Sequence, residues 1–214
     1  MDADARHAAT LFIMRLAPVI PVLTVKSVAD GLAQARALVA GGLPAIEVTL
    51  RTDAALEAIK EIAKSVPGAH VGAGTIVSPH QIDAAVKAGA TFLVSPGCTD
   101  SLAAAARQAP IPMLPGAATA SEAMILREHG FRALKLFPAE AVGGAKLLAS
   151  LAAPLPDLMF CPTGGIDLAK APTYLALPNV ACVGGSWMLP KEALASGDYG
   201  TVERLAREAA ALRP

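Results

Sequence analysis

A single lysine interrupts an apolar run that is typical of a buried β-strand, Ala133-Leu134-Lys135-Leu136-Phe137. Because side chains alternate across a strand, Leu134 and Leu136 share one face and Lys135 points to the other. A buried, unpaired ammonium group is costly, so burial favours the neutral amine, which is the form that attacks a keto carbon. The run alone leaves two other interpretations open: a lysine held in a buried ion pair, and a lysine whose ammonium group reaches the rim.

A second apolar run, residues 45–51, carries three polar side chains at alternate positions. Glu47, Thr49 and Arg51 therefore share one face, and the apolar residues between them share the other. A carboxylate close to an amine can move the protons that form and break an imine. The planar guanidinium group of Arg51 suits a substrate carboxylate. The alternative is a buried ion pair that takes no part in chemistry.

Glycines end two later β-like runs, in Thr163–Gly164–Gly165 and in Gly184–Gly185–Ser186. Glycine lets bare backbone N–H groups approach an anion, and the Ser186 hydroxyl adds a donor. We expect both segments to be turns that bind a phosphate; tight turns that serve only the chain path are the alternative. A further stretch of this kind, Gly72–Ala73–Gly74–Thr75, ends with a hydroxyl group.

The elements that must position these residues form a regular series. Ala-rich segments with apolar residues at i, i+3, i+4 and i+7 alternate with short β-rich runs. A strand followed by a helix, repeated eight times, predicts an α/β fold, the TIM (β/α)8 barrel. In such barrels the loops after strands seven and eight frequently bind phosphate. The eight runs begin near Val19, Ala45, His70, Phe92, Pro112, Ala133, Leu158 and Val180.

One domain is expected over residues 1–214, with an N-terminal helix at 1–17, a barrel core at 18–194 and a C-terminal helix at 198–212. The extra N-terminal helix is predicted to plug the bottom of the barrel. An open doubly wound sheet is the alternative, but KSVADG after the first run lacks the Gly-rich fingerprint of that fold. A solenoid is disfavoured, because the segments share no side-chain pattern beyond strand then helix.

Composition excludes several classes of protein. The 18 basic side chains equal the 18 acidic ones, whereas nucleic-acid binding needs a cluster of excess positive charge. The first residues lack the features of a signal peptide, and no apolar run approaches the ~20 residues that cross a bilayer. Three cysteines without CxxC spacing are typical of free thiols in a reducing compartment. We expect a soluble, cytoplasmic protein with no nucleic-acid or membrane partner.

The remaining polar residues form no motif. Four histidines show neither HExxH nor paired spacing, so no metal site and no cofactor are expected. Tyr174 is predicted to be a packing residue, and Glu140 to be solvated.

Two segments carry a specific resemblance. GLPAIEVTLR (residues 42–51) and GFRALKLFPAEAVGG (residues 130–144) resemble the two signature segments of the 2-keto-3-deoxy-6-phosphogluconate (KDPG) and 4-hydroxy-2-oxoglutarate (KHG) aldolase family. VGAGTI, FLVSPG, PMLPGAAT, FCPTGGI and CVGGSW are similar to other family segments in the same order. The similarity runs from about Pro18 to Leu194, which is most of the chain.

The resemblance implies a role for each candidate residue. Lys135 is implied to be the Schiff-base lysine and Glu47 the general acid/base. Arg51 and Thr75 would hold the pyruvyl carboxylate, while Phe137 packs beside the imine. The family is also implied to form homotrimers and to need no metal and no cofactor. On the aldehyde side of the substrate, the resemblance implies stereochemical control by Thr163 and phosphate binding by Gly164, Gly165, Gly184, Gly185 and Ser186.

The implied reaction is that of a class I (Schiff-base) aldolase, a lyase that cleaves 2-dehydro-3-deoxy-6-phospho-D-gluconate to pyruvate and D-glyceraldehyde 3-phosphate. In carbohydrate metabolism this is a step of the Entner–Doudoroff pathway. Related aldolases for the galactonate epimer carry an arginine at the end of strand one, where this chain has Thr24, so the gluconate substrate is favoured.

Three alternatives remain at this stage. KHG cleavage to pyruvate and glyoxylate, as sole or second activity, is the nearest. A phosphate-binding barrel isomerase or synthase without a covalent intermediate belongs to a different class. A sugar-phosphate sensor without turnover is the third. An inward Lys135 beside Glu47 disfavours the last two.

Overall fold

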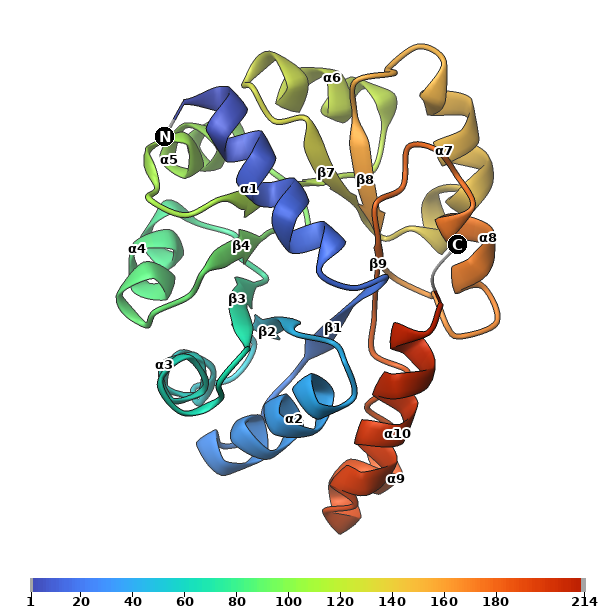
Figure 1. The fold of residues 1–214 in the computed structure, drawn as a ribbon. Coiled ribbons are helices and arrows are strands. Elements are labelled where there is room, and N and C mark those ends of the chain that lie inside the picture. Colours follow the sequence, from blue (N-terminus) through green and yellow to red (C-terminus); the bar gives the residue numbers. More distant parts are fainter. Residues whose placement is uncertain (1, 213–214) are drawn as a thin grey trace.

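The computed structural model describes residues 2–212; Met1 and residues 213–214, at the ends of the predicted domain, lie outside them. Short strands surround a common axis and helices lie around the outside (Figure 1). All strand pairs are parallel, in the orders β5-β4-β3-β2-β1-β9 and β6-β7-β8. The strands are β1 (Val19–Leu23), β2 (Ala45–Thr49), β3 (His70–Gly74), β4 (Phe92–Val94), β5 (Met113–Leu114), β6 (Gly116–Ala117), β7 (Ala133–Leu136), β8 (Met159–Pro162) and β9 (Val183–Gly185).

The two sheets close into one barrel. β5 and β6 are halves of a single strand position interrupted at Pro115, which has no N–H to donate to a ladder. On one side Ser95 N donates to Leu114 O at 3.3 Å, and on the other Lys135 N donates to Pro115 O at 2.8 Å. A parallel bridge between Thr163 and Gly184 joins β8 to β9. The eight strand positions confirm the predicted TIM barrel.

Two strand predictions need correction. The fifth run is split in two at its proline. The last run begins as a strand only at Val183, because Val180 makes just an isolated bridge to Phe160. Each of the eight predicted runs nevertheless contains one of the strands.

The helices follow the strands in turn, and several begin at a residue whose side chain caps the first turn. Ser27, Thr99 and Thr119 each accept a hydrogen bond from the backbone N–H three residues later. The six-residue helix α9 was not predicted as a separate element. The helices are α1 (Ala3–Arg15), α2 (Val28–Ala40), α3 (Ala55–Ser65), α4 (Pro79–Lys87), α5 (Asp100–Gln108), α6 (Ala120–Glu128), the 3₁₀ turn η1 (Glu140–Val142), α7 (Gly144–Ala152), α8 (Ala171–Leu175), α9 (Lys191–Ser196) and α10 (Tyr199–Ala210).

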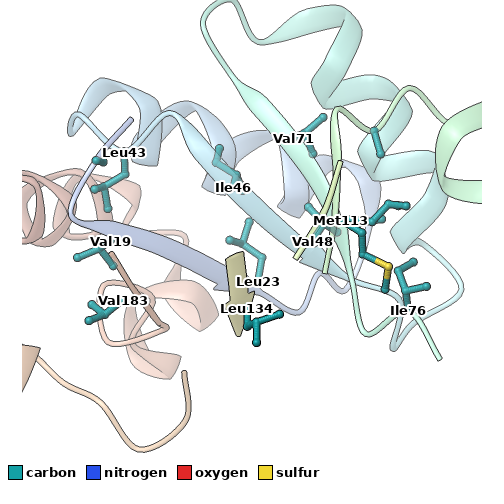
Figure 2. Packing of buried hydrophobic residues seen from close by; sticks show 14 of the residues in the cluster. Val19, Leu23, Leu43, Ile46, Val48, Val71, Ile76, Met113, Leu134 and Val183 are labelled. Atoms are coloured by element: carbon teal, nitrogen blue, oxygen red, sulfur yellow. The ribbon is translucent and has the colours of Figure 1, made fainter. Parts of the chain in front are cut away.

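Apolar side chains form two separate clusters, one on each side of the barrel wall. The outer cluster lies between strands and helices and includes Ile46, Val48 and Leu134 (Figure 2). Leu136 belongs to the same cluster, so the predicted outward faces of β2 and β7 are confirmed. The amphipathic α3 covers this wall with Ala55, Ala58, Ile59 and Ile62, at the i, i+3, i+4, i+7 spacing.

The inner cluster fills the bottom of the barrel. It joins Ile13 and Met14 of α1 to inward side chains that include Ile20, Ala45 and Ala133. α1 crosses the barrel at the end where β1 begins, so the opposite end is the mouth at which all the strands finish (Figure 1). The predicted plugging helix is confirmed. No helix within residues 2–212 is both long enough and apolar enough to cross a membrane.

Candidate active site

Lys135 and Glu47 meet inside the barrel. Lys135 Nζ lies 3.2 Å from Glu47 Oε1 and 3.3 Å from Oε2. Lys135 is only 5% exposed and Glu47 only 3%. The Phe137 ring lies beside the amine, with its centroid 5.4 Å from Nζ. The strand periodicity thus predicted the correct face for all three side chains, although 88 residues separate Glu47 from Lys135.

The surroundings keep this pair dry. Below it lies the inner apolar cluster that α1 closes. Beside the pair, Glu47 fills the space next to Gly74. A side chain at Gly74 would clash with it, since a Cβ there would lie 2.7 Å from Glu47 Cδ. The carboxylate lies within hydrogen-bond distance of the amine, which is the geometry that proton transfer between the two groups requires. The arrangement therefore suits an amine that must become neutral before it attacks a carbonyl.

We expect Gly74→Ala to lower turnover by roughly 10²-fold, because the added methyl group pushes the Glu47 carboxylate away from Lys135 without removing any charged group. Steady-state kinetics measure the loss of turnover, and a thermal melt measures any loss of stability separately. Gly97→Ala is the matched control, since a Cβ there meets no atom within 4 Å. Equal kinetics for the two variants would show that the position of Glu47 is unimportant.

Arg51 and Thr75 meet at the barrel mouth. Arg51 Nε donates to Thr75 Oγ1 at 3.1 Å, and the guanidinium group is exposed. Thr75 has φ of +59° and is the one non-glycine residue with positive φ among those described. A β-branched residue in this conformation costs about 1–3 kcal/mol, and such strain concentrates at functional sites. The two residues expected to share a carboxylate are therefore in direct contact.

Thr24 also lies at the mouth. Its hydroxyl is 3.1 Å from that of Thr49, which donates to Leu23 O at 2.7 Å. The position where an arginine would mark the galactonate-type relatives is therefore filled by a neutral hydroxyl group that is already paired with the barrel wall.

The two Gly-rich segments differ from each other. Gly164 and Gly165 form the predicted turn after β8, with φ of +107° and +79°. The prediction of a turn at Gly184 and Gly185 is wrong, because both lie within β9, in register with Ile20 and Pro21. A side chain is excluded there by neighbours rather than by φ: a Cβ on Gly184 would lie 3.1 Å from Thr163 Cβ, and one on Gly185 would overlap the Trp187 ring. Ser186 is the first exposed residue beyond this strand.

A cavity of about 520 Å³ is lined by three residues that the sequence singled out and by two lysines that it missed. The three are Thr24, Arg51 and Ser186, and the lysines are Lys26 and Lys191. No acidic residue lines it, and neither lysine forms an ion pair with any residue in the 2–212 range. Lys26 lies in the β1–α2 loop, and Lys191 is the first residue of α9. The sequence marked them only by their position after a predicted strand.

The prediction that Glu140 is solvated was only half right, and Tyr174 does more than pack. The Glu140 side chain is 36% exposed, but its carboxylate accepts a hydrogen bond from the Tyr174 hydroxyl and pairs with Lys170 Nζ at 2.9 Å. Hydrogen bonds from Tyr174 and Lys170 lower the pKa of Glu140. Sequence periodicity carries no sign of this contact, because 34 residues separate the tyrosine from the glutamate.

Two of the three thiols, those of Cys98 and Cys182, do not compete with Lys135 as nucleophiles. Burial raises the pKa of Cys98 to about 11, and burial also raises the pKa of Cys182 in the barrel interior. Because the thiolate is the reactive form, both groups are inert at neutral pH. Among the described residues, no group of three His, Cys, Asp or Glu side chains is arranged to hold a metal ion.

Comparison with known proteins decides between the families that this geometry permits. Residues 11–205 match the family model described as KDPG and KHG aldolase. The chain belongs to the KDPG and KHG aldolase family.

Members of this family resemble the chain over most of its length. The 2-dehydro-3-deoxy-phosphogluconate aldolase of Pseudomonas aeruginosa is 51% identical over 195 residues, which is 91% of this chain and 89% of that protein. The KHG/KDPG aldolase of Escherichia coli is 49% identical, with 92% of each chain covered. These family members confirm the prediction of an aldolase, a carbon–carbon lyase.

A solved structure from the same family agrees with the fold. The KDPG aldolase of Legionella pneumophila, crystallised with pyruvate captured at low pH as a covalent carbinolamine intermediate, matches with a TM-score of 0.92. It is 41% identical, and the match covers 94% of this chain and 98% of that one.

Proposed function

We propose that this protein is a class I aldolase that cleaves 2-dehydro-3-deoxy-6-phospho-D-gluconate to pyruvate and D-glyceraldehyde 3-phosphate. The observation that carries the proposal is the buried contact of 3.2 Å between Lys135 Nζ and the Glu47 carboxylate, placed under a mouth that presents Arg51. An amine, a proton carrier and a carboxylate binder are what Schiff-base cleavage of a 2-keto acid requires.

The reaction follows from these positions. Glu47 takes a proton from Lys135, and the neutral amine adds to C2 of the substrate. Glu47 returns that proton to the C2 hydroxyl, which leaves as water and gives an iminium ion. The iminium ion draws in the electrons of the C3–C4 bond as the Glu47 carboxylate takes the proton of the C4 hydroxyl. Glyceraldehyde 3-phosphate leaves, and Glu47 delivers the proton to C3 of the enamine. Water then hydrolyses the imine and releases pyruvate, which returns the amine of Lys135.

Binding groups at the mouth orient the substrate. Arg51 and Thr75 face the pyruvyl carboxylate, which places C2 beside Lys135. Thr163 lies on the aldehyde side of the reacting bond. The Gly164–Gly165 turn, the Gly184–Gly185 strand end and Ser186 are proposed to receive the phosphate. Positioning of this kind can supply many kcal/mol of a barrier.

The cations of the cavity support a substrate with two anionic groups, a carboxylate and a phosphate. Lys26 and Lys191 stand in the same cavity as Arg51 and Ser186, with no acidic lining residue to balance them. Like charges gathered without a counter-ion favour the binding of anions. They supply positive charge at a mouth where Thr24 supplies none.

A second activity, cleavage of 4-hydroxy-2-oxoglutarate to pyruvate and glyoxylate, is also proposed. It is supported by the name of the E. coli relative, KHG/KDPG aldolase. The reacting halves of the two substrates are the same 2-keto acid, so Lys135, Glu47 and Arg51 serve both. An isomerase or synthase without a covalent intermediate has no use for the buried amine.

Pyruvate release tests the proposed function. The protein is given each substrate in turn, and pyruvate is measured through NADH oxidation by lactate dehydrogenase, with and without EDTA. We expect pyruvate from the phosphorylated substrate at a rate that EDTA leaves unchanged, because the iminium ion is the electron sink. Absence of pyruvate from both substrates would reject the aldolase proposal, and loss of the activity in EDTA would reject the Schiff-base mechanism.

Three further proposals remain. From the family resemblance we infer a homotrimer and a step of the Entner–Doudoroff pathway. From the free cysteines, which suit a reducing compartment, we infer a cytoplasmic location.

A further inference from the structure

Three side chains form a connected group behind the Gly164–Gly165 turn. The Tyr174 hydroxyl of α8 donates to Glu140 Oε1 of η1. Lys170 Nζ lies 2.9 Å from Glu140 Oε2 and donates to Gly165 O at 2.8 Å. The group therefore joins the loop that follows β7, the strand of Lys135, to the turn that follows β8.

The tyrosine at the centre of this group is held firmly. Tyr174 is only 2% exposed. Its hydroxyl fits against the backbone of Gly144, where a Cβ would lie 2.7 Å from the oxygen. Burial and the neighbouring Glu140 carboxylate raise the pKa of Tyr174, so the phenol keeps its proton and remains the donor. Hydrogen bonds to a charged acceptor are stronger than those between neutral groups.

The group and its loop take up three successive carbonyl groups of the turn. Ala139 N donates to Thr163 O at 2.8 Å, Glu140 N donates to Gly164 O at 3.1 Å, and Lys170 Nζ binds Gly165 O. The Glu140 side chain packs against Gly165, where a Cβ would lie 2.8 Å from Glu140 Cγ. A side chain at Gly165 would displace Glu140, whereas one at Gly164 would crowd Pro138, with its Cβ 3.3 Å from Pro138 Cα.

The orientation of the carbonyl groups fixes the orientation of the N–H groups. In a trans peptide, C=O and N–H point in opposite directions. The N–H groups of Gly164, Gly165 and Ile166 therefore point away from η1 and Lys170. None of the three donates a hydrogen bond within the described part of the chain. Successive free N–H groups of this kind form an anion-binding nest.

We propose that Tyr174, Glu140 and Lys170 are positioning residues for the phosphate end of the substrate, which they serve by fixing the peptide orientations of the Gly164–Gly165 turn. The inference rests on the proposed function. Glu140 itself is unsuited to bind phosphate because it is negatively charged; Lys170 balances that charge, and the Tyr174 hydroxyl donates a hydrogen bond to it. The role of the group is therefore to shape the nest rather than to contact the ligand.

Tyr174→Phe tests the inference, since it removes a single hydroxyl group. Two quantities are compared with the wild type: KM for the phosphorylated substrate, and the pyruvate concentration that gives half-maximal borohydride trapping on Lys135. We expect KM to rise about tenfold, the equivalent of ~1.4 kcal/mol, while the pyruvate concentration stays within about twofold. Tyr199→Phe is the matched control, because the Tyr199 hydroxyl contacts Asp30 at 3.4 Å on the α10 side of the barrel.

Lys170→Met provides a second variant that keeps the test decisive if Tyr174→Phe fails to fold. Its side chain is 47% exposed, so the change leaves the core intact, and we expect KM for the phosphorylated substrate to rise about threefold. An unchanged KM in the folded variants, or an equal loss of pyruvate trapping, would overturn the positioning role. Absence of pyruvate trapping in the wild type would instead reject the proposed function.

Discussion

Replacement of Lys135 by alanine is expected to abolish cleavage, with a loss of at least about 10⁵-fold, because no other amine can take its place as the nucleophile. The buried ion pair with Glu47 offers a competing explanation for any loss, since removal of one partner leaves an uncompensated charge that destabilises the fold. Activity must therefore be measured at a temperature where circular dichroism shows the variant to be folded.

Lys135→Arg separates the two explanations. Arginine keeps the positive charge that pairs with Glu47, but its guanidinium group stays protonated and forms no Schiff base. We expect this variant to be as inactive as the alanine variant. Substantial turnover in a folded Lys135→Arg protein would mean that Lys135 serves only as an ion-pair partner.

Glu47→Gln is expected to have the next largest effect. Glutamine keeps the shape and a hydrogen bond to Lys135 but takes up no proton, so turnover should fall by about 10²–10⁴-fold, the usual range for general acid–base catalysis. Lys135 keeps its amine, so borohydride trapping of pyruvate should still occur, although more slowly. Steady-state and trapping rates, measured side by side, separate proton transfer from covalent bond formation.

Glu57→Gln is the matched control for this change. Glu57 lies on α3, is 55% exposed and pairs with Lys60, an interaction that contributes little to stability. We expect wild-type kinetics from it. If Glu47→Gln turned over as fast as this control, Glu47 would have no place in the mechanism.

The buried pair of Lys135 and Glu47 was predictable because it depends on strand periodicity. The alternation of apolar and polar residues fixed the inward face of β2 and of β7, and a closed barrel brings inward side chains together whatever their separation in sequence. The same reasoning found the plugging helix, since an amphipathic segment before the first strand has one open barrel end to cover. Family resemblance then supplied the reaction, which periodicity cannot.

The loops were less predictable because their conformations depend on contacts between distant residues. The pattern at Gly184 and Gly185 is that of a turn, yet the crowding of Thr163 and Trp187 makes both part of a strand. Tyr174 and Glu140 meet only because the loops after β7 and β8 fold against each other.

Lys26 and Lys191 share a cavity for a similar reason. Neither belongs to a periodic face, and the helix that presents Lys191 is only six residues long. Side chains that line the cavity at the mouth were therefore the hardest to find from sequence.

Trapping with borohydride is the most direct test of whether Lys135 becomes covalently bound to the substrate. The protein is incubated with pyruvate, reduced, and digested with trypsin. Because a modified Lys135 resists trypsin, the adduct is expected on the peptide spanning residues 133–146, with the added mass of a reduced pyruvyl group. Fragmentation must place that mass on Lys135. An adduct on another lysine would contradict the site, and the absence of any adduct would contradict the Schiff-base mechanism itself.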